Sequence, residues 1–178
     1  MAAMGLRNRG LEVTVFGLDE PPYLNSDLVE ALGATYLSTK NTTLEDAGNR
    51  SGRSDLVFEC TGFSPLVFDG AQHLLAKNGV MVLSSVTGGE RTTQVQSDAF
   101  NLDMVLGNKV MVGTVNANRD HFEEGVRDMA TAEARWPGWL QRLITHRVDG
   151  LDHYEQAFEA LGQQGAIKVV MEISTDER

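Results

Sequence analysis

Short apolar runs rich in β-branched and aromatic residues recur along the chain, separated by more polar segments. The runs at residues 12–16, 55–60, 79–84 and 109–115 have the length and composition of strands buried on both faces, as in a parallel sheet. A similar run at 166–173 predicts one more strand.

The segments between these runs place apolar residues three and four positions apart, a spacing typical of helices with one buried face. Gly33 and Gly79 stand where two of these helices should stop. Strands that alternate with helices favour right-handed crossovers, so we predict an α/β fold built on a doubly wound parallel sheet. The predicted helices cover residues 2–8, 24–32, 65–76, 120–134 and 151–161.

The order of the first elements is unusual for such a fold. The helix predicted over residues 2–8 leads directly into the strand at 12–16. In a nucleotide-binding sheet the central strand precedes that helix, and a Gly-rich turn between the two holds the pyrophosphate. We therefore expect a Rossmann-like sheet without its first strand and Gly-rich turn, and a native start upstream of Met1. The strands on either side of the gap would lie roughly 10 Å apart unless the sheet closes up.

The 178-residue chain carries a formal charge of −10, which argues against some classes of partner. An acidic protein repels the phosphates of nucleic acids and anionic lipids, so we expect a small-molecule partner, no nucleic acid and no membrane. No apolar run approaches the ~20 residues that cross a bilayer, and the N-terminal residues do not have the pattern of a secretory signal. Cys60 is the single cysteine, which excludes an internal disulfide and a zinc site of several thiolates. We expect a cytoplasmic protein.

Two acidic residues follow the strand at 12–16. Asp19 stands where a carboxylate of a nucleotide-binding sheet accepts hydrogen bonds from the adenosine ribose hydroxyls, and Glu20 is the second candidate. A turn ahead of Pro21 and Pro22 also favours Asp for conformational reasons alone. Both interpretations stay open at this point.

Thr61 and Gly62 follow the strand at 55–60, at the carboxyl edge of the predicted sheet, where open α/β sheets bind ligands. A glycine there lets a ligand approach the backbone, and it is equally compatible with a plain strand-to-helix turn. Cys60 has no His or Lys near it in the sequence to stabilise a thiolate, so we expect a small buried apolar residue and not a nucleophile.

Two further strands end in polar residues that should face the same edge. The strand at 79–84 continues into Ser85, and the strand at 109–115 continues into Asn116 and Asn118. An Asn amide both donates and accepts, which suits a carboxamide or a sugar hydroxyl, but Asn is also a frequent helix cap. We assign the ligand contact to Asn116 and the cap to Asn118. The histidines stand isolated along the chain and predict structural or surface roles and no metal site.

Stretches that span nearly the whole chain resemble the C-terminal domain of the medium-chain, zinc-type dehydrogenases. The run at 108–122 is the most specific and is similar to glucose dehydrogenases of the archaeal type. The stretch LITHRVDGLDHYEQAFEAL is shared with alcohol, threonine and sorbitol dehydrogenases and does not discriminate among them. The other matching stretches are MAAMGLRNRGLEVTVFG, LVEALGATYLST, SDLVFECTGF, NGVMVLSS, NKVMVGTVNANRDHFEEGV and AIKVVMEI.

The resemblance implies an oxidoreductase that takes hydride from a sugar hydroxyl, at the anomeric carbon of glucose, and passes it to NAD or NADP. It implies that Asn116 also contacts the sugar, and that Thr61 and Gly62 lie along the adenosine side of the cofactor. Lys168 is implied to contact the cofactor as well. The residues implied to line the nicotinamide and its ribose are Ser84, Ser85, Val86, Thr114, Val115 and Asn116.

The family's zinc ligands and proton-relay residues belong to an N-terminal catalytic domain, so none is assigned to this chain. The resemblance implies that residues 1–178 form a cofactor-binding domain, incomplete at its N-terminus and inactive alone, whose complete enzyme binds zinc and forms a homo-oligomer. Relatives that use NADP tend to have an arginine pair where this chain has Leu18 and Asp19. Because Arg binds a phosphate that Asp repels, we predict a preference for NAD over NADP.

Two alternatives remain open on the sequence. An alcohol, threonine or polyol dehydrogenase of the same superfamily would lack a sugar-specific contact at Asn116. A non-catalytic, free-standing nucleotide-binding module would need a genuine start at Met1 and a sheet that closes without its central strand, which would expose an apolar strand edge.

Overall fold

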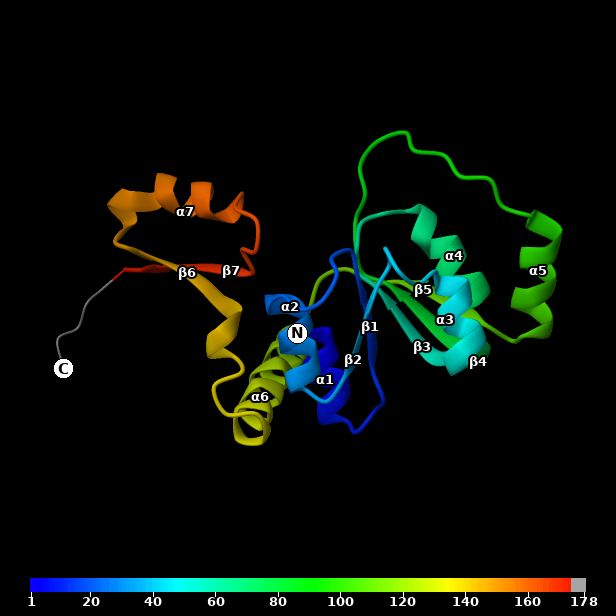
Figure 1. The fold of residues 1–178 in the computed structure, drawn as a ribbon, viewed down its shortest axis with the longest axis horizontal. Helices are drawn as coiled ribbons and strands as arrows, with labels where there is room; N and C mark the ends of the chain where they lie inside the picture. Colours follow the sequence, from blue (N-terminus) through cyan, green and yellow to red (C-terminus); the bar gives the residue numbers. More distant parts are fainter. Residues whose placement is uncertain (174–178) are drawn as a thin grey trace. The chain divides into compact units, whose positions relative to one another are not determined.

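The computed structural model describes residues 1–173, which fall into two compact units. We call residues 39–117 the central unit, and residues 1–38 together with 118–173 the terminal unit. Within the described part of the chain all strand pairs are parallel and form three sheets, in the orders β1-β2, β3-β4-β5 and β6-β7 (Figure 1). The predicted α/β class is confirmed. β1 and β3 belong to different sheets, and β6 and β7 form a third.

In the terminal unit, segments far apart in the sequence share one apolar core. Met4, Leu32 and Trp139 are each at most 5% exposed and pack in the same cluster. The Nε1 atom of Trp139 donates to the Leu28 carbonyl at 2.8 Å, so the buried indole leaves no polar atom unpaired. The elements of this unit are α1 (Ala2–Asn8), β1 (Thr14–Gly17), α2 (Leu24–Ala31), β2 (Thr35–Ser38), α6 (Arg119–Arg135), η1 (Gln141–Leu143), β6 (Ile144–Asp149), η2 (Leu151–His153), α7 (Tyr154–Leu161) and β7 (Lys168–Glu172).

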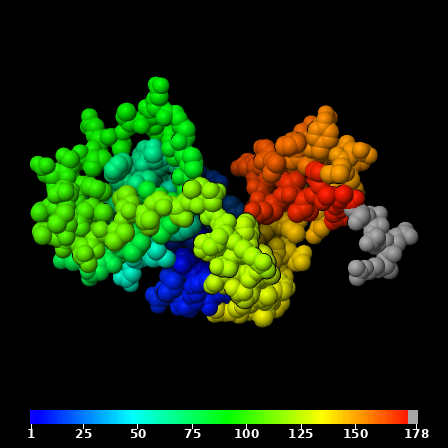
Figure 2. All heavy atoms as spheres, turned by 180° about the vertical axis from the view of Figure 1, so that it is seen from behind, coloured from blue at the N-terminus to red at the C-terminus, as the bar shows by residue number. Residues whose placement is uncertain are grey.

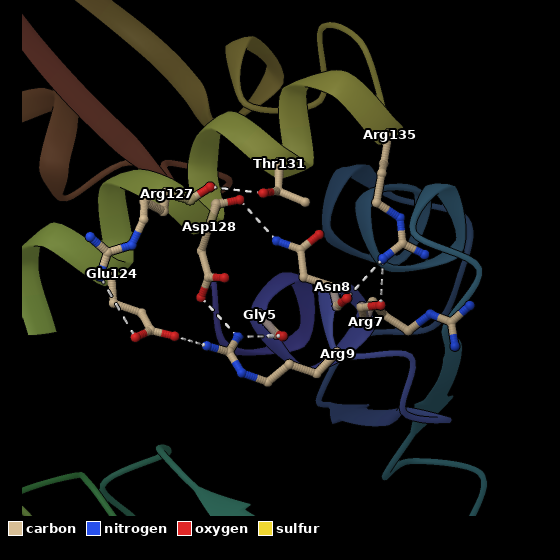
Figure 3. A network of polar contacts seen from close by, with 9 residues as sticks. All are labelled: Gly5, Arg7, Asn8, Arg9, Glu124, Arg127, Asp128, Thr131 and Arg135. Carbon is tan, nitrogen blue, oxygen red and sulfur yellow. Dashed lines mark hydrogen bonds and ion pairs between the residues drawn. The ribbon is translucent and has the colours of Figure 1, made fainter.

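α1 lies beside α6 although more than a hundred positions separate them in the sequence (Figure 2). Arg9 forms ion pairs with Glu124 at 2.7 Å and with Asp128 at 2.9 Å, and Arg135 donates to the Asn8 carbonyl at 3.0 Å (Figure 3). Partly exposed ion pairs contribute at most about 1 kcal/mol each. The seven-residue α1 is too short to be stable alone, so we infer that burial of Met4 supplies most of its stability and the polar contacts fix its orientation.

The central unit is a three-stranded parallel sheet whose middle strand is β4. Leu75 and Met81 of β4 and Ala71 of α4 are at most 1% exposed and form its apolar core. α4 therefore covers one face of the sheet. The elements of this unit are α3 (Leu44–Ser51), β3 (Ser54–Glu59), α4 (Pro65–His73), β4 (Leu75–Leu83), α5 (Ser97–Leu106) and β5 (Val110–Gly113).

The structure corrects the expectations at several places. The spacing of apolar residues did not predict β2, β6, α3 or α5. The assignment of Gly79 as a helix stop was wrong, because α4 ends at His73 and Gly79 lies inside β4. Gly79 is needed there for packing, since a Cβ atom would come within 2.9 Å of the Ala76 carbonyl oxygen. Gly33 ends α2 as predicted, with φ of +70° just after the cap residue Leu32.

Candidate functional site

The three strands of the central unit end level with one another. Glu59, Leu83 and Gly113 are partners in the registers of β3, β4 and β5. The pairing continues one step further, because the Ser84 amide donates to the Glu59 carbonyl at 3.0 Å and the Thr114 amide donates to the Leu83 carbonyl at 2.9 Å. We call this the carboxyl edge of the central sheet. It brings together most of the predicted site residues: Thr61, Gly62, Ser84, Ser85, Val86, Thr114, Val115 and Asn116.

Glu59 organises this edge, and the sequence analysis missed it. Glu59 is the last residue of β3 and is only 7% exposed. Oε1 accepts from the Thr61 amide at 2.7 Å and from the Thr61 hydroxyl at 2.6 Å, while Oε2 accepts from the Ser85 hydroxyl at 2.5 Å. The signal that could have revealed it is a charged residue closing an otherwise apolar strand run.

The carboxylate of Glu59 is stabilised in its ionised form. Burial alone raises the pKa of this carboxyl group. The hydrogen bonds from Ser85, from Thr61 and from the backbone of Thr61 and Gly62 outweigh that effect and hold the pKa of Glu59 below its ordinary value. At neutral pH Glu59 therefore carries a buried negative charge that hydroxyl and amide donors stabilise.

Gly62 leaves the carboxyl edge open beside Thr61. Its φ of +71° is a conformation that favours glycine, and a Cβ atom would find nothing closer than the Val86 carbonyl oxygen at 3.8 Å. The Thr61 hydroxyl also accepts from the Phe63 amide at 3.0 Å, so the turn is closed by its own side chain. The backbone conformation explains the glycine by itself, and a close approach of a ligand stays a prediction.

Cys60 differs from the expectation in one respect. The residue is exposed, so the prediction of a buried side chain was wrong: β3 ends at Glu59, and Cys60 lies beyond the last paired position. Partial desolvation and the neighbouring Glu59 carboxylate raise the pKa of the thiol. A raised pKa disfavours the thiolate, which supports the view that Cys60 is not a nucleophile.

The residues that follow β3, β4 and β5 at the carboxyl edge are called strand exits below, and the exit after β5 is open to solvent. Val115 is 75% exposed, and Thr114 and Asn116 are exposed as well. Asn116 has φ of +66°, a conformation that Asn tolerates better than most residues with a side chain. The contact of Asn116 with a ligand therefore stays a prediction, because its backbone gives a separate reason for an Asn. Asn118 caps α6 as predicted, with its Oδ1 atom accepting from the His121 amide at 3.0 Å.

Asp19 lies in the terminal unit, in an exposed turn just past β1 that two tyrosines hold in place. The Tyr36 hydroxyl donates to the Asp19 carbonyl at 2.7 Å and contacts the Tyr23 hydroxyl at 2.7 Å. Gly17 makes room for this ring, because a Cβ atom there would lie 2.3 Å from the Tyr36 hydroxyl oxygen. Burial, followed by the contact with Tyr23, raises the pKa of Tyr36 well above its ordinary value. Neither tyrosine was predicted from the sequence: Tyr36 lies in β2, which was not predicted, and Tyr23 stands just ahead of α2.

Lys168 also belongs to the terminal unit. It is exposed and opens β7, and its carbonyl accepts from the Thr145 hydroxyl at 3.2 Å. Nothing in the geometry tests its predicted contact with a cofactor. In residues 1–173 no group of three or more His, Cys, Asp or Glu side chains is placed to hold a metal ion.

The parallel α/β architecture is Rossmann-like and is shared with solved medium-chain, zinc-type dehydrogenases to which the chain is similar. The family model of the glucose dehydrogenase C-terminus matches residues 1–173, and the chain belongs to this family. The archaeal resemblance inferred from the sequence is thereby confirmed.

Individual relatives agree with this assignment. The chain is 42% identical to glucose 1-dehydrogenase 1 of Caldivirga maquilingensis over 98% of its own length, and 36% identical to glucose 1-dehydrogenase of Methanocella arvoryzae over 97%. Among solved structures, the glucose dehydrogenase of Haloferax mediterranei in complex with NADP, Zn and gluconolactone is 31% identical, with a TM-score of 0.83 over 98% of this chain. The 2R,3R-butanediol dehydrogenase of Bacillus subtilis, at 17% identity and a TM-score of 0.67, shares the fold. The chain spans about half the length of these relatives, 47% of each.

Proposed function

We propose that this chain is the cofactor-binding half of a glucose (aldose) 1-dehydrogenase, which transfers hydride from a sugar hydroxyl to NAD(P). The observation that carries the proposal is the level ending of β3, β4 and β5, which gathers the polar exits of a glucose dehydrogenase family member at one edge. Open α/β sheets bind ligands at this edge.

The residues of the carboxyl edge suit a nicotinamide dinucleotide. Thr61 and Gly62 offer an uncrowded stretch of backbone for the adenosine side, and the exits after β4 and β5, which are partly or fully exposed, offer backbone and amide groups to the nicotinamide and its ribose. Asn116 would contact the sugar as well, and Lys168 of the terminal unit would contact the cofactor. When bound, the nicotinamide ring accepts the hydride, while the protein supplies binding and orientation. The exits in question are Ser84, Ser85, Val86, Thr114, Val115 and Asn116.

Asp19 favours NAD over NADP in this proposal. A carboxylate accepts hydrogen bonds from ribose hydroxyls and repels a 2′-phosphate. The Haloferax relative was solved with NADP, so cofactor choice has to be measured for this chain directly. We expect a lower Kd for NADH than for NADPH, and we expect Asp19→Asn to reduce the difference between these two Kd values. A lower Kd for NADPH in the unmodified protein would contradict the assignment.

The zinc site and the catalytic groups belong to further polypeptide in this proposal. Within the described residues β1 and β3, like every strand except β4, have a partner strand on one side only, and unpaired strand edges favour addition of another strand. A strand from an N-terminal half, followed by a Gly-rich turn, would add at one of these open edges. In the complete enzyme a zinc ion held by that further polypeptide would supply Lewis-acid chemistry towards the sugar hydroxyl.

The remaining expectations concern the setting of the enzyme. Within residues 1–173 no helix is both long and apolar enough to cross a membrane. We propose a cytoplasmic protein without nucleic-acid partners, supported by the formal charge of −10 and by a single cysteine. The resemblance to the family is the reason to propose a homo-oligomer.

The deciding experiment uses the protein isolated from its source at its native length. We expect a subunit mass close to twice the 19.4 kDa of this chain and oxidation of glucose with NAD, followed as NADH absorbance. Xylose, threonine and ethanol serve as competing substrates, and faster turnover of threonine or ethanol would move the assignment to the alcohol or threonine enzymes. A native protein of 178 residues that binds NADH but oxidises none of these substrates would instead support the hypothesis of a non-catalytic nucleotide-binding module.

A further inference from the structure

Glu59 is a buried carboxylate to which the proposed function gives no role. None of the ion pairs among residues 1–173 involves it, and its hydrogen-bond partners are all neutral donors. Burying an ionised carboxylate without a cation is costly unless several donors compensate for the lost water. An apolar residue at this position would avoid that cost, so the charge calls for an explanation.

The partners of Glu59 come from two separate strand exits. Thr61 lies two positions after Glu59, in the loop that follows β3, whereas Ser85 lies 26 positions after Glu59, in the loop that follows β4. The Ser84 hydroxyl adds a bond to the Glu59 carbonyl at 2.9 Å. One residue thus ties the loop after β3 to the loop after β4 through both its backbone and its side chain.

We propose that Glu59 is a positioning residue, whose ionised carboxylate locks these two loops and turns the hydroxyl protons of Thr61 and Ser85 away from the ligand. This inference rests on the proposed function for the identity of the ligand. The locking itself is a property of the central unit and holds without any ligand.

The direction of the hydroxyl protons decides what the edge can recognise. A hydroxyl has one donor and two acceptor sites, and Glu59 takes the donor of both Thr61 and Ser85. The Phe63 amide uses one of the two acceptor sites of Thr61, whereas both acceptor sites of the partly exposed Ser85 are left for a ligand. The edge therefore favours uncharged ligand groups with O–H or N–H donors, such as a ribose hydroxyl or a carboxamide, and disfavours an anionic oxygen.

The first test needs no ligand and uses the chain as it stands. In Glu59→Gln the side-chain amide must present its NH₂ group to at least one of the donors that the carboxylate accepted. We expect hydrogen exchange at the Thr61 and Phe63 amides to accelerate about tenfold, from the loss of charge-assisted bonds. Glu45→Gln, an exposed carboxylate of the same unit with no contact to the edge, serves as the control and should leave both rates unchanged. Equal rates in wild type and Glu59→Gln would overturn the proposal.

The second test measures ligand selection in the protein at native length. We compare the Kd of NAD with that of its nicotinic-acid analogue, in which a carboxylate replaces the carboxamide. In Glu59→Gln the Ser85 hydroxyl can accept from the new amide and turn its proton outward, so the preference for NAD should fall about fivefold or more. Ser85→Ala removes both the ligand contact and one bond to Glu59, so it should weaken NAD binding and reduce the preference for NAD over the analogue, which covers the case of a poorly folding Glu59 variant.

The outcomes separate the two hypotheses. If the wild type binds no dinucleotide, the proposed function fails, and the exchange rates still decide whether Glu59 locks the loops. If exchange accelerates in Glu59→Gln but the NAD preference is unchanged in both variants, the role in ligand selection is refuted. Faster exchange together with a reduced preference supports the whole inference.

Discussion

Removing one hydroxyl group from β2 tests how the Asp19 turn is held. Tyr36 is 8% exposed, and its hydroxyl bridges the Asp19 carbonyl and the Tyr23 hydroxyl at 2.7 Å each. Tyr36→Phe removes both hydrogen bonds and keeps the ring that packs against Tyr23 at a centroid distance of 5.6 Å. A hydrogen bond contributes about 0.5–1.5 kcal/mol net, and water can replace part of the loss at the exposed Asp19. We therefore expect the free energy of unfolding to fall by about 1–2 kcal/mol.

Urea unfolding followed by circular dichroism measures this change. Tyr154→Phe is the matched control, because Tyr154 is 51% exposed and its hydroxyl, among residues 1–173, makes a single long contact with Glu155 at 3.4 Å. A surface change of this kind should stay within about 0.5 kcal/mol. If both variants unfold at the same urea concentration, the hydroxyl bridge does not stabilise the turn and the reasoning is refuted.

The Tyr36 bridge also has a pH signature. The pKa of Tyr36 is raised in the folded protein, mainly by burial, above the value of about 10 of an exposed tyrosine. Its contribution is complete below that unfolded value and is lost as the pH rises through the folded pKa, since the unfolded chain ionises first. The stability difference between wild type and Tyr36→Phe should therefore stay constant up to about pH 10 and shrink from about pH 10 to pH 12. A constant difference across this range would speak against the raised pKa.

Three further predictions concern the central unit and the cap of α6. Gly48→Ala should destabilise the protein by about 1–3 kcal/mol, because a Cβ atom would lie 2.2 Å from the His73 carbonyl oxygen. Gly125→Ala should stabilise α6 by up to about 1 kcal/mol, because a Cβ atom there would have nothing within 4 Å. Thermal unfolding of both variants checks these opposite signs. Asn118→Ala should cost about 1 kcal/mol in urea unfolding, and no change would mean that the cap is dispensable. The lowered pKa of Glu59 contributes stability that is present above about pH 4.3 and is lost as the pH falls through the folded pKa, so the urea midpoint of wild type should drop more steeply on acidification than that of Glu59→Gln.

The sequence predicted the elements whose pattern is long or strongly apolar. α1 and most of β1, β3, β4 and β5 follow from their apolar runs and spacing. β2 was missed because four residues that alternate between exposed and buried give a weak signal, and its partner β1 lies 21 positions earlier in the chain. α3 owes its start to a cap, with Thr43 accepting from the Asp46 amide at 3.0 Å, and has few apolar residues to reveal it.

The candidate site divides in the same way. The positions of the strand exits follow from where apolar runs stop, so Thr61, Ser84 and Asn116 could be placed at a sheet edge from the sequence. The level register that brings these exits together belongs to strand pairing, which no local pattern contains. Glu59 was missed for the same reason, since its partner Ser85 is 26 positions away.

What the sequence by itself determined is the α/β class, the family resemblance and the identity of the exits, because apolar periodicity and short motifs are local properties of the chain. Only the tertiary structure decided that an ionised Glu59 binds two loops together, that Tyr36 holds the Asp19 turn, and that β1 and β3 each keep one open edge among the described residues. These features depend on hydrogen bonds between segments that meet only after folding, and their strength comes from burial that the sequence pattern does not report.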